Sequence, residues 1–568
     1  FNALAGVERY LSRVMKDFSE IERITLVDLN NVVVADVSRN PAEGASGILP
    51  RDLQTADKNI IVSPMLSGNT LVGQLVLQID KNFVSSKMRN ILLDVFVLGL
   101  IAVLLSFEMV IWTVSNTIGK PIDRVFIVLN EQASGVFRHI IRPDAAGTLM
   151  RIARRLSDRA YDLAERGGTS GKLASMHKAY FSDIRFPLFL YSTATEISGS
   201  FLPIFARDSS SLSWLSDDMA ATAPLIAYLA AIALVSPFSG HIASRIGGRN
   251  LFLLSIPVTA MTLIGIGLGH SVVSISLWHG AMALVYALAT VACQEYSLGA
   301  ASKGENAQVM GGYLFVILGG AFCGASLGGV LADRIGIPGT FFFSAGLALA
   351  SGLLGYFALS AKADRHSVSD GVPARVEPLA SGSILFTPRF LSLLTGVTLP
   401  INVGTSVFVW FITPLALEAQ GAGFADIGRV MMVYYLVPLL VGPTFARMAD
   451  GRIGYAPFLV AGLSVSGIAL TSLFFWSGFW PVAVAVGVFG LGRSMCDSSH
   501  YAQAIHIAET SGLRNARLTG LAGLPIIERL AAIAGLLVAA VFIESVGYVS
   551  ITVLIWLIIF AGAVVVAT

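Results

Sequence analysis

The chain has 568 residues, of which 55% are hydrophobic and only 13% are charged, and its formal net charge is +2. Soluble domains carry about 25% charged residues, so this composition excludes a soluble globular protein and predicts an integral membrane protein. The near-neutral balance favours neither nucleic acid nor a strongly acidic ligand as a partner. The three cysteines lie within apolar runs, so we expect no disulfide framework, no metal site and no cofactor.

Residues 1–88 show the alternating pattern of a small α/β domain. Segments 24–27 and 32–34 are predicted strands on either side of a turn at 28–31, and 71–79 is a later strand. The order of helix, hairpin and later strand resembles the membrane-proximal part of a Cache sensor domain, a PAS-like extracytoplasmic fold. An unspecialised α/β domain is the alternative. Because the chain begins at Phe1 without Met or a signal peptide, we expect this segment to be incomplete.

The next region, 90–114, is a predicted transmembrane helix, because an apolar run of this length crosses a hydrocarbon core of about 30 Å. We expect Glu108, late in this helix, at the membrane interface. Residues 115–170 then contain two heptad-like segments, 122–134 and 149–163, and Pro121 begins the first while Gly135 ends it. This pattern resembles a HAMP signal-relay module, which implies a homodimer, although Ala145 replaces the usual Glu. A plain amphipathic linker is the alternative.

Residues 184–568 contain about twelve apolar segments of membrane-spanning length. They begin near residues 184, 219, 250, 273, 306, 338, 390, 426, 456, 480, 515 and 547. The polar stretch 361–389 divides them into two sets of six, 184–360 and 390–568. This layout resembles the major facilitator superfamily, so we expect an α-helical membrane protein with the 12-helix fold of that family.

The basic residues favour one orientation in the membrane. If Arg185 is cytoplasmic, the outer turns hold only Arg207, Arg334 and Arg429. The inner turns then hold Arg245, Arg249, Lys303, Lys362, Arg365, Arg375, Arg447, Arg452, Arg514 and Arg517. Cytoplasmic loops carry an excess of Lys and Arg. The same orientation places residues 1–88 outside and 115–170 inside, so we expect a multi-pass protein of the bacterial inner membrane, embedded in its lipids.

The fifth predicted helix of the transporter-like region carries glycines at a spacing suited to close helix packing. They are Gly311, Gly320, Gly324, Gly328 and Gly329. Glycine has no side chain, so two backbones can approach to contact distance along such a face. The spacing resembles the antiporter motif of drug/proton exporters in the superfamily. Any tightly packed membrane helix is the alternative.

Two inner loops resemble the gating signature of the superfamily. The first, at 240–249, contains Arg245 and Arg249 but has Ser244 where the signature has an acid. The second, at 449–454, contains Asp450 and Arg452 and is its half-repeat partner, as expected of a duplicated fold. The resemblance implies that these loops form charge contacts that hold the inner gate shut.

Ionisable residues at membrane depth are costly unless they are paired or hydrated, so each is a candidate site. Helices one, four, seven and ten line the cavity in this superfamily, and Glu196, Glu295 and Asp497 fall on the first, fourth and tenth predicted helices. Glu196 is the proton-coupling candidate, because a buried carboxyl can hold a proton in one access state and release it in another; a structural protonated Glu196 is the alternative. On the seventh helix, Asn402 and Trp410 are suited to contact a ligand, with core packing as the alternative for Trp410.

Two further pairs of charged residues lie within the carboxy-terminal apolar segments. Arg493 and Asp497 are four residues apart on one helical face, so we expect an ion pair, either structural or acting as a proton or substrate switch. Glu528 and Arg529 are adjacent, so they point in different directions and each needs its own partner. All four are candidates for substrate binding or proton coupling.

The sequence contains no P-loop, no cluster of metal ligands and no nucleophile elbow, so we expect neither an enzyme nor an ATP-driven pump. The function that fits best is secondary active transport of a small molecule. We expect a proton-coupled exporter, an antiporter, gated by an extracytoplasmic ligand through the HAMP-like module. A ligand-sensing receptor that signals through a partner is one alternative, and a proton-coupled importer is another.

Overall fold

The computed structural model describes most of the predicted membrane helices and part of the amino-terminal domain. The described residues are 10–15, 21–29, 32–38, 60–67, 70–79, 81–134, 139–140, 179–209, 215–301, 305–360, 384–449, 454–475, 478–511 and 516–567, with residue 7 and isolated residues between 151 and 175. They belong to two compact units, Phe1–Gly99 and Leu100–Thr568. Most of the predicted segment 149–163 and of the predicted loop 361–389 lies outside the described residues.

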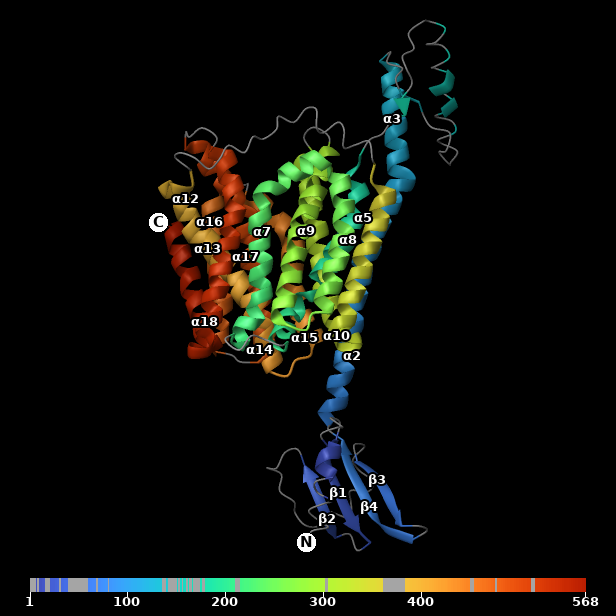
Figure 1. The fold of residues 1–568 in the computed structure, drawn as a ribbon, viewed down its shortest axis with the longest axis vertical. Coiled ribbons are helices and arrows are strands. Elements are labelled where there is room, and N and C mark those ends of the chain that lie inside the picture. The colour runs from blue at the N-terminus through green and yellow to red at the C-terminus, as the bar shows by residue number, and fades with distance from the viewer. Residues whose placement is uncertain are drawn as a thin grey trace. The chain divides into compact units, whose positions relative to one another are not determined.

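The first unit contains a four-stranded antiparallel sheet of order β2-β1-β4-β3 (Figure 1). Its strands are β1 (Ile21–Asp28), β2 (Val33–Ser38), β3 (Ile60–Ser67) and β4 (Thr70–Ile79). β1 and β2 form the predicted hairpin, and β4 covers the predicted later strand. The sequence prediction lacks β3, whose Pro64 weakens the strand signal. This strand lies at the edge of the sheet, where Pro is tolerated.

The sheet carries a small core and one well-formed ion pair. Leu11 packs with Ile24 in the buried core of this unit. The Arg23 guanidinium donates hydrogen bonds to Asp36, the shortest at 2.6 Å, and it holds the pKa of that carboxyl below its ordinary value. Cross-strand pairing between β1 and β2 places these two side chains close together.

A continuous helical path follows the sheet. It consists of α2 (Lys81–Val114), the π-turn η2 (Ser115–Gly119) and α3 (Lys120–Ala133). The predicted membrane segment 90–114 is therefore helical throughout. Pro121 comes directly after the π-turn, and because the helical path is continuous there, its missing N–H removes one helical hydrogen bond.

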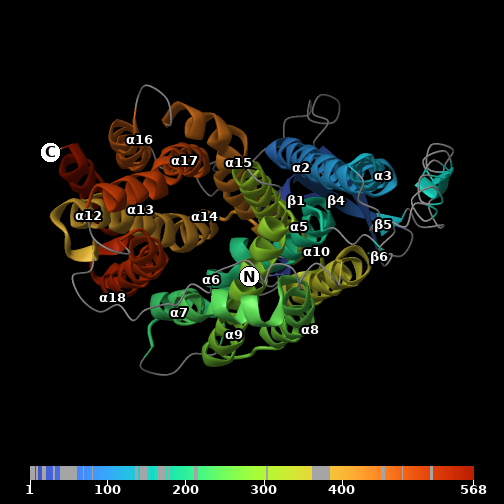
Figure 2. The same cartoon turned by 90° about the horizontal axis from the view of Figure 1, so that it is seen from above.

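The second unit contains two groups of helices, which Figure 2 shows in green to yellow and in orange to red. The first group is α5 (Phe181–Glu196), η3 (Ile197–Ser200), α6 (Leu202–Arg207), α7 (Asp217–Ile246), α8 (Gly248–Gly267), α9 (Val272–Gly299) and α10 (Asn306–Ala358). The second is η4 (Ile384–Phe386), α12 (Pro388–Leu393), η5 (Leu394–Thr398), α13 (Leu399–Val403), η6 (Gly404–Ile412), α14 (Thr413–Ala419), α15 (Phe424–Met448), α16 (Tyr455–Phe475), α17 (Phe479–Thr510) and α18 (Ala516–Ala567). Most of these helices begin within one turn of the predicted positions.

The two longest helices each contain a sharp turn at a glycine. Gly336 in α10 has φ 75° and Gly547 in α18 has φ 77°. Glycine adopts positive φ at no steric cost, so each of these helices consists of two helical segments. Each of these two glycine turns lies just before the last helical segment of its group of helices. Within the described residues, ten helices are long and apolar enough to cross a membrane, with each kinked helix counted once.

The glycine face of α10 packs directly on α5. A Cβ at Gly320 would lie 2.8 Å from the Phe189 carbonyl oxygen, and one at Gly324 would lie 2.6 Å from the Thr193 oxygen. Gly328 meets the backbone of the following turn η3 in the same way. These contacts are the close backbone approach that the glycine spacing predicts.

Two glycines of the predicted face have other surroundings. Gly329 packs against the Phe424 backbone at the start of α15, so it joins the two groups of helices. A Cβ at Gly311 would meet nothing within 4 Å, whereas one at its neighbour Gly312 would lie 2.7 Å from the Phe181 ring. The sequence prediction for Gly311 is therefore wrong, because the contact falls one residue later on the helix.

We predict that Gly324→Leu destabilises the protein and abolishes transport, because its side chain would collide with the α5 backbone. Overpacking of this kind costs about 1–3 kcal/mol. Gly311→Leu is the matched control, since it adds the same side chain to the same helix in open space. Thermal unfolding in detergent compares the two variants, and equal melting temperatures would contradict the packing argument.

Candidate functional site

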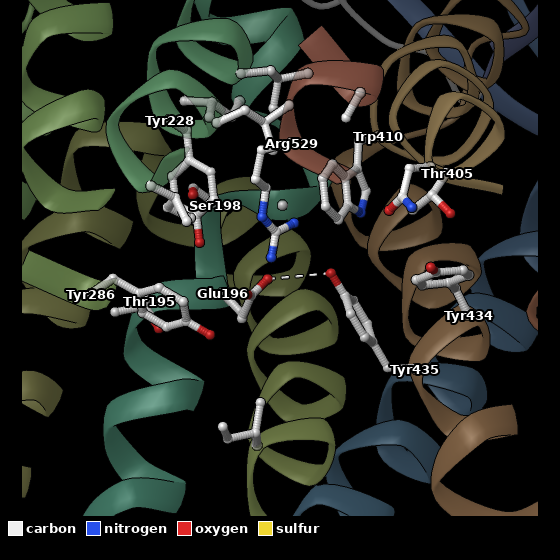
Figure 3. Close-up of a pocket in the computed structure, with 18 of the residues that line it drawn as sticks. Thr195, Glu196, Ser198, Tyr228, Tyr286, Thr405, Trp410, Tyr434, Tyr435 and Arg529 are labelled. Carbon is white, nitrogen blue, oxygen red and sulfur yellow. Dashed lines mark hydrogen bonds between the residues drawn. The ribbon is translucent and has the colours of Figure 1, made fainter. Parts of the chain in front are cut away.

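A cavity of about 410 Å³ lies between the two groups of helices (Figure 3). Its lining comes from α5, η3, α6, α7, α9 and α10 on one side and from α13, η6, α15, α17 and α18 on the other. Pockets for small organic molecules typically have volumes of about 300–1,000 Å³. The lining includes five of the residues predicted from the sequence, which are Glu196, Asn402, Trp410, Arg493 and Arg529.

Glu196 is placed by the packing of α5 against α10. It is the last residue of α5, where the chain tightens into the 3-10 turn η3. A Cβ at Gly324 would lie 3.0 Å from the Glu196 Cβ, so the glycine leaves room for this side chain. The Tyr435 hydroxyl on α15 donates a hydrogen bond to the Glu196 carboxyl at 3.3 Å. Glu196 therefore joins the two groups of helices through an uncharged partner.

Arg493 is held within the second group of helices. It forms the predicted ion pair with Asp497, one turn later on α17, at 2.9 Å. Its guanidinium also donates hydrogen bonds to Thr405 Oγ1 at 3.1 Å and to Asn402 Oδ1 at 3.4 Å. The positive charge of Arg493 is thus balanced by an acid, and its remaining donors are used by residues of α13 and η6.

Glu528 and Arg529 point in different directions, as predicted from their adjacency. Glu528 is buried and accepts a hydrogen bond from the Tyr501 hydroxyl at 3.1 Å, with His500 Nδ1 3.6 Å from its carboxyl. Arg529 lines the cavity, and Figure 3 shows its guanidinium pointing toward the Glu196 carboxyl. Arg529 and Glu196 come from opposite groups of helices, α18 and α5.

Four tyrosines of the lining are missing from the sequence prediction: Tyr228, Tyr286, Tyr434 and Tyr435. The sequence signal for these residues is a tyrosine within an apolar span, because a buried phenol hydroxyl needs a hydrogen-bond partner.

Glu295 of α9, which the sequence offers as a candidate, is not among the described residues that line the cavity. The described part of the chain also contains no group of three His, Cys, Asp or Glu side chains that could hold a metal ion.

Polar contacts join the two groups where α7 and α15 begin, at the end predicted to be the outer one. The Arg207 guanidinium of α6 pairs with the Glu418 carboxylate of α14 at 2.6 Å. The Asp333 carboxylate of α10 accepts hydrogen bonds from the backbone N–H groups of Phe424 and Ala425, at 3.1 and 2.8 Å. An acid at the start of a helix also interacts favourably with the helix dipole. These contacts hold the two groups of helices together at the end predicted to be the outer one.

The predicted gating loops are described in part. Arg249 donates a hydrogen bond from Nε to the Leu359 carbonyl oxygen at 2.9 Å, so it binds the end of α10 within the first group. Arg245 is exposed in the last turn of α7. Asp450 and Arg452 lie outside the described residues.

Within the second unit, the carboxy-terminal part of α2 contacts α5 through a buried ion pair. The Glu108 carboxylate is fully buried and accepts two hydrogen bonds from the Arg185 guanidinium of α5, at 2.6 and 2.8 Å. The bidentate partner compensates the burial of the Glu108 carboxylate, and its predicted position at the membrane interface stays a prediction. Beside this pair, the Phe107 ring packs against the Phe315 ring of α10.

A second polar network lies at the start of α5. The Asp183 carboxylate pairs with the Lys120 ammonium of α3 and accepts a hydrogen bond from the Tyr296 hydroxyl of α9 at 3.0 Å. The Tyr296 oxygen in turn accepts a hydrogen bond from the Ser360 N–H, just after α10, at 3.3 Å. Asp183 therefore connects α3 to the predicted inner ends of three helices of the first group.

We predict that Arg207→Gln increases access to the cavity from outside, because it removes an ion pair that holds the outer ends together. Since such half-exposed pairs contribute about 0.2–1 kcal/mol, the increase should reach about fivefold. The measurement is the rate at which a membrane-impermeant maleimide labels a cysteine introduced by Ser198→Cys.

The exposed Asp217, at the same end of the first group and at the start of α7, provides the control, Asp217→Asn, which also removes one charge. The exchange of charges in Arg207→Glu with Glu418→Arg should restore slow labelling. Equal labelling rates for Arg207→Gln and Asp217→Asn would contradict the closing role of the pair.

Comparison with known proteins agrees with this architecture. Residues 186–420 match the family model of the Major Facilitator Superfamily. The Multidrug resistance protein MdtG of Dickeya zeae is 26% identical over 265 residues, which are 44% of this chain and 61% of the relative. The MdtG proteins of Salmonella arizonae and Citrobacter koseri are 25% and 26% identical over 261 residues, 44% of this chain and 62% and 61% of those relatives. The matches thus span less than two thirds of the length of each relative, and they show that this chain is similar to the major facilitator superfamily over residues 186–420.

Proposed function

We propose that the protein is a secondary active exporter that exchanges a small organic molecule for protons. The observation that carries this proposal is the position of Glu196, in a cavity between two groups of helices and bonded to one uncharged partner, Tyr435. A carboxyl favours its neutral form when water is excluded and its charged form when water or a cation arrives. Glu196 can therefore hold a proton in one access state and release it in the other.

Transport by this arrangement requires the two groups of helices to rock around the cavity. The contacts of Arg207 and Asp333 hold the two groups together at the predicted outer end in the structure. When they separate, the cavity faces outward, and the hydrogen bond between Tyr435 and Glu196 breaks because its atoms belong to opposite groups. Protonation of Glu196 is thereby linked to the direction in which the cavity opens.

The direction of transport is supported by the relatives. Their name, Multidrug resistance protein, fits export of organic molecules from the cell. An importer driven by the same proton gradient would use the same cavity and the same carboxyl, and it differs only in direction. Because the matched family consists of transporters, the comparisons favour transport over an enzymatic activity.

The proposal also includes the division of the chain into domains. Twelve helices would form the transporter, in halves 184–360 and 390–568 joined by a cytoplasmic loop at 361–389. Residues 1–88 would be a Cache-like sensor outside the cell, 90–114 a membrane helix and 115–170 a HAMP-like cytoplasmic module that pairs with a second copy. The antiparallel sheet in 1–88 and the helical path through α2 and α3 are compatible with these assignments.

The contacts of α2 and α3 offer a route by which the sensor would gate transport. Glu108 binds Arg185 in the middle of this route, and Lys120 binds Asp183 at its end. Through Tyr296, Asp183 reaches α9 and the end of α10. A shift of α2 would therefore move the predicted inner ends of three helices that surround the cavity. The same route favours a receptor as the second candidate function, in which ligand binding in the cavity would be reported through α3 to a partner.

We predict that Glu196→Gln abolishes transport driven by a pH gradient, because an amide cannot release a proton. Folding should be retained, since Gln preserves the hydrogen bond from Tyr435. The measurement is flux into proteoliposomes of a panel of organic cations and amino acids, with and without an imposed pH gradient.

Glu295→Gln is the control, because it removes a carboxyl of the same region that does not line the cavity. Coupling lost in both variants, or in neither, would remove Glu196 from the proposed mechanism. Binding of panel members without any flux would favour the receptor.

We predict that Arg185→Leu destabilises the protein by about 3–5 kcal/mol, because it leaves the buried Glu108 carboxylate without its partner. Adding Glu108→Leu should restore stability, since two apolar side chains replace a buried ion pair. The double variant should nevertheless transport at an altered rate, because α2 and α5 are no longer joined. Thermal unfolding and proteoliposome flux test the two parts, and wild-type flux in the stable double variant would contradict the gating route.

A further inference from the structure

The charges that line the cavity are not balanced among themselves. Three charged side chains of the described residues contribute to the lining, namely Glu196, Arg493 and Arg529. Arg493 is neutralised by Asp497 at 2.9 Å. The other two face the cavity from opposite groups of helices, and Tyr435 is the hydrogen-bond partner of Glu196.

Arg529 forms no ion pair and no hydrogen bond in the described part of the chain, and its electrostatic interaction there is with the adjacent Glu528 carboxyl. Its Nε is buried and donates to no acceptor there. A guanidinium has five N–H donors in a planar fork that matches a carboxylate or phosphate. Leaving such a group unpaired at membrane depth is costly, so its retention in a cavity wall indicates a ligand that pairs with it.

Glu196 does not neutralise Arg529 in this structure. Although Figure 3 shows the two groups pointing toward one another, no salt bridge joins them in the described part of the chain, and the hydrogen bond drawn at Glu196 comes from Tyr435. The space between them is part of the cavity. A molecule in that space would meet a carboxylate on the side of the first group and a guanidinium on the side of the second.

We infer that the substrate is an amphoteric small molecule, which carries an amine and a carboxylate. Its carboxylate binds the Arg529 guanidinium and its amine binds the Glu196 carboxylate. The aromatic lining, which includes Tyr228, Tyr286 and Trp410, suits an apolar or aromatic body between the two charged groups.

This inference rests on the proposed function and explains how exchange could arise. The substrate amine and a proton compete for the Glu196 carboxylate, so binding of one displaces the other. Arg529 remains charged throughout and holds the substrate by its acid end. The substrate therefore bridges the two groups of helices, in place of the hydrogen bond that Tyr435 donates to Glu196 in this structure.

The test compares matched probes that share one aromatic body. Phenylalanine carries both charges, its methyl ester carries only the amine, and 3-phenylpropionate carries only the acid; tryptophan, tyrosine and their analogues extend the set. Flux into proteoliposomes is measured under an imposed pH gradient, beside a lipophilic cation. We expect the wild-type protein to prefer an amino acid to both of its analogues. Arg529→Gln should lower the flux ratio of amino acid to ester by about tenfold or more, because a charge-assisted contact is lost, and Arg529→Lys should restore part of it.

Three outcomes would overturn the inference. Arg529→Gln could lower the flux of the amino acid and the ester equally, which would show a structural role. Flux could be restored when Glu196→Gln is added to Arg529→Gln, which would show that the two side chains serve only each other. Proton-driven flux of the lipophilic cation without flux of any amphoteric probe would reject the substrate class while leaving the proposed exporter intact. Absence of all flux would instead reject the proposed function itself.

Discussion

The cost of placing charge in a hydrocarbon environment controls this structure. Glu108 is fully buried, and it is tolerated because Arg185 binds it with two short hydrogen bonds. Asp497 and Arg493 neutralise each other in the same way one helical turn apart. Against this background Glu196 and Arg529 stand out, because each faces the cavity without an ion pair in the described residues. Uncompensated charge in a membrane protein marks a place where a ligand or a proton completes the balance.

The position of Glu196 also depends on the glycine face of α10, where no side chain separates this helix from α5. Gly324 allows α10 to approach α5 so closely that Glu196, at the end of α5, is held beside the α10 backbone. Gly328 supports the 3-10 turn η3 that follows. The glycine pattern and the candidate carboxyl, which are far apart in the sequence, are therefore parts of one packing arrangement.

Local patterns in the sequence predicted much of this fold, whereas contacts between distant segments were harder to predict. Apolar runs predicted where most helices begin, and the four-residue spacing predicted the pair of Arg493 and Asp497. The partner of Glu108 could not be predicted, because Arg185 lies 77 residues away and no local periodicity connects them. Tyr435 was missed for the same reason, since it reaches Glu196 from the other group of helices. The error of one residue at Gly311 reflects helix rotation, which spacing alone does not determine.

The burial of each ion pair also distinguishes the contacts that break during transport from those that persist. Arg207 and Glu418, which join the two groups at the predicted outer end, are 24% and 28% exposed, so water replaces their interaction at little cost. Glu108 is 0% exposed, and separating it from Arg185 would leave a charge without compensation in the membrane. α2 and α5 must therefore move together while the outer ends separate. In the proposed exporter, the helix that leads from the amino-terminal domain would therefore travel with the first group of helices, and a force on α2 would act on the rocking of that group against the second.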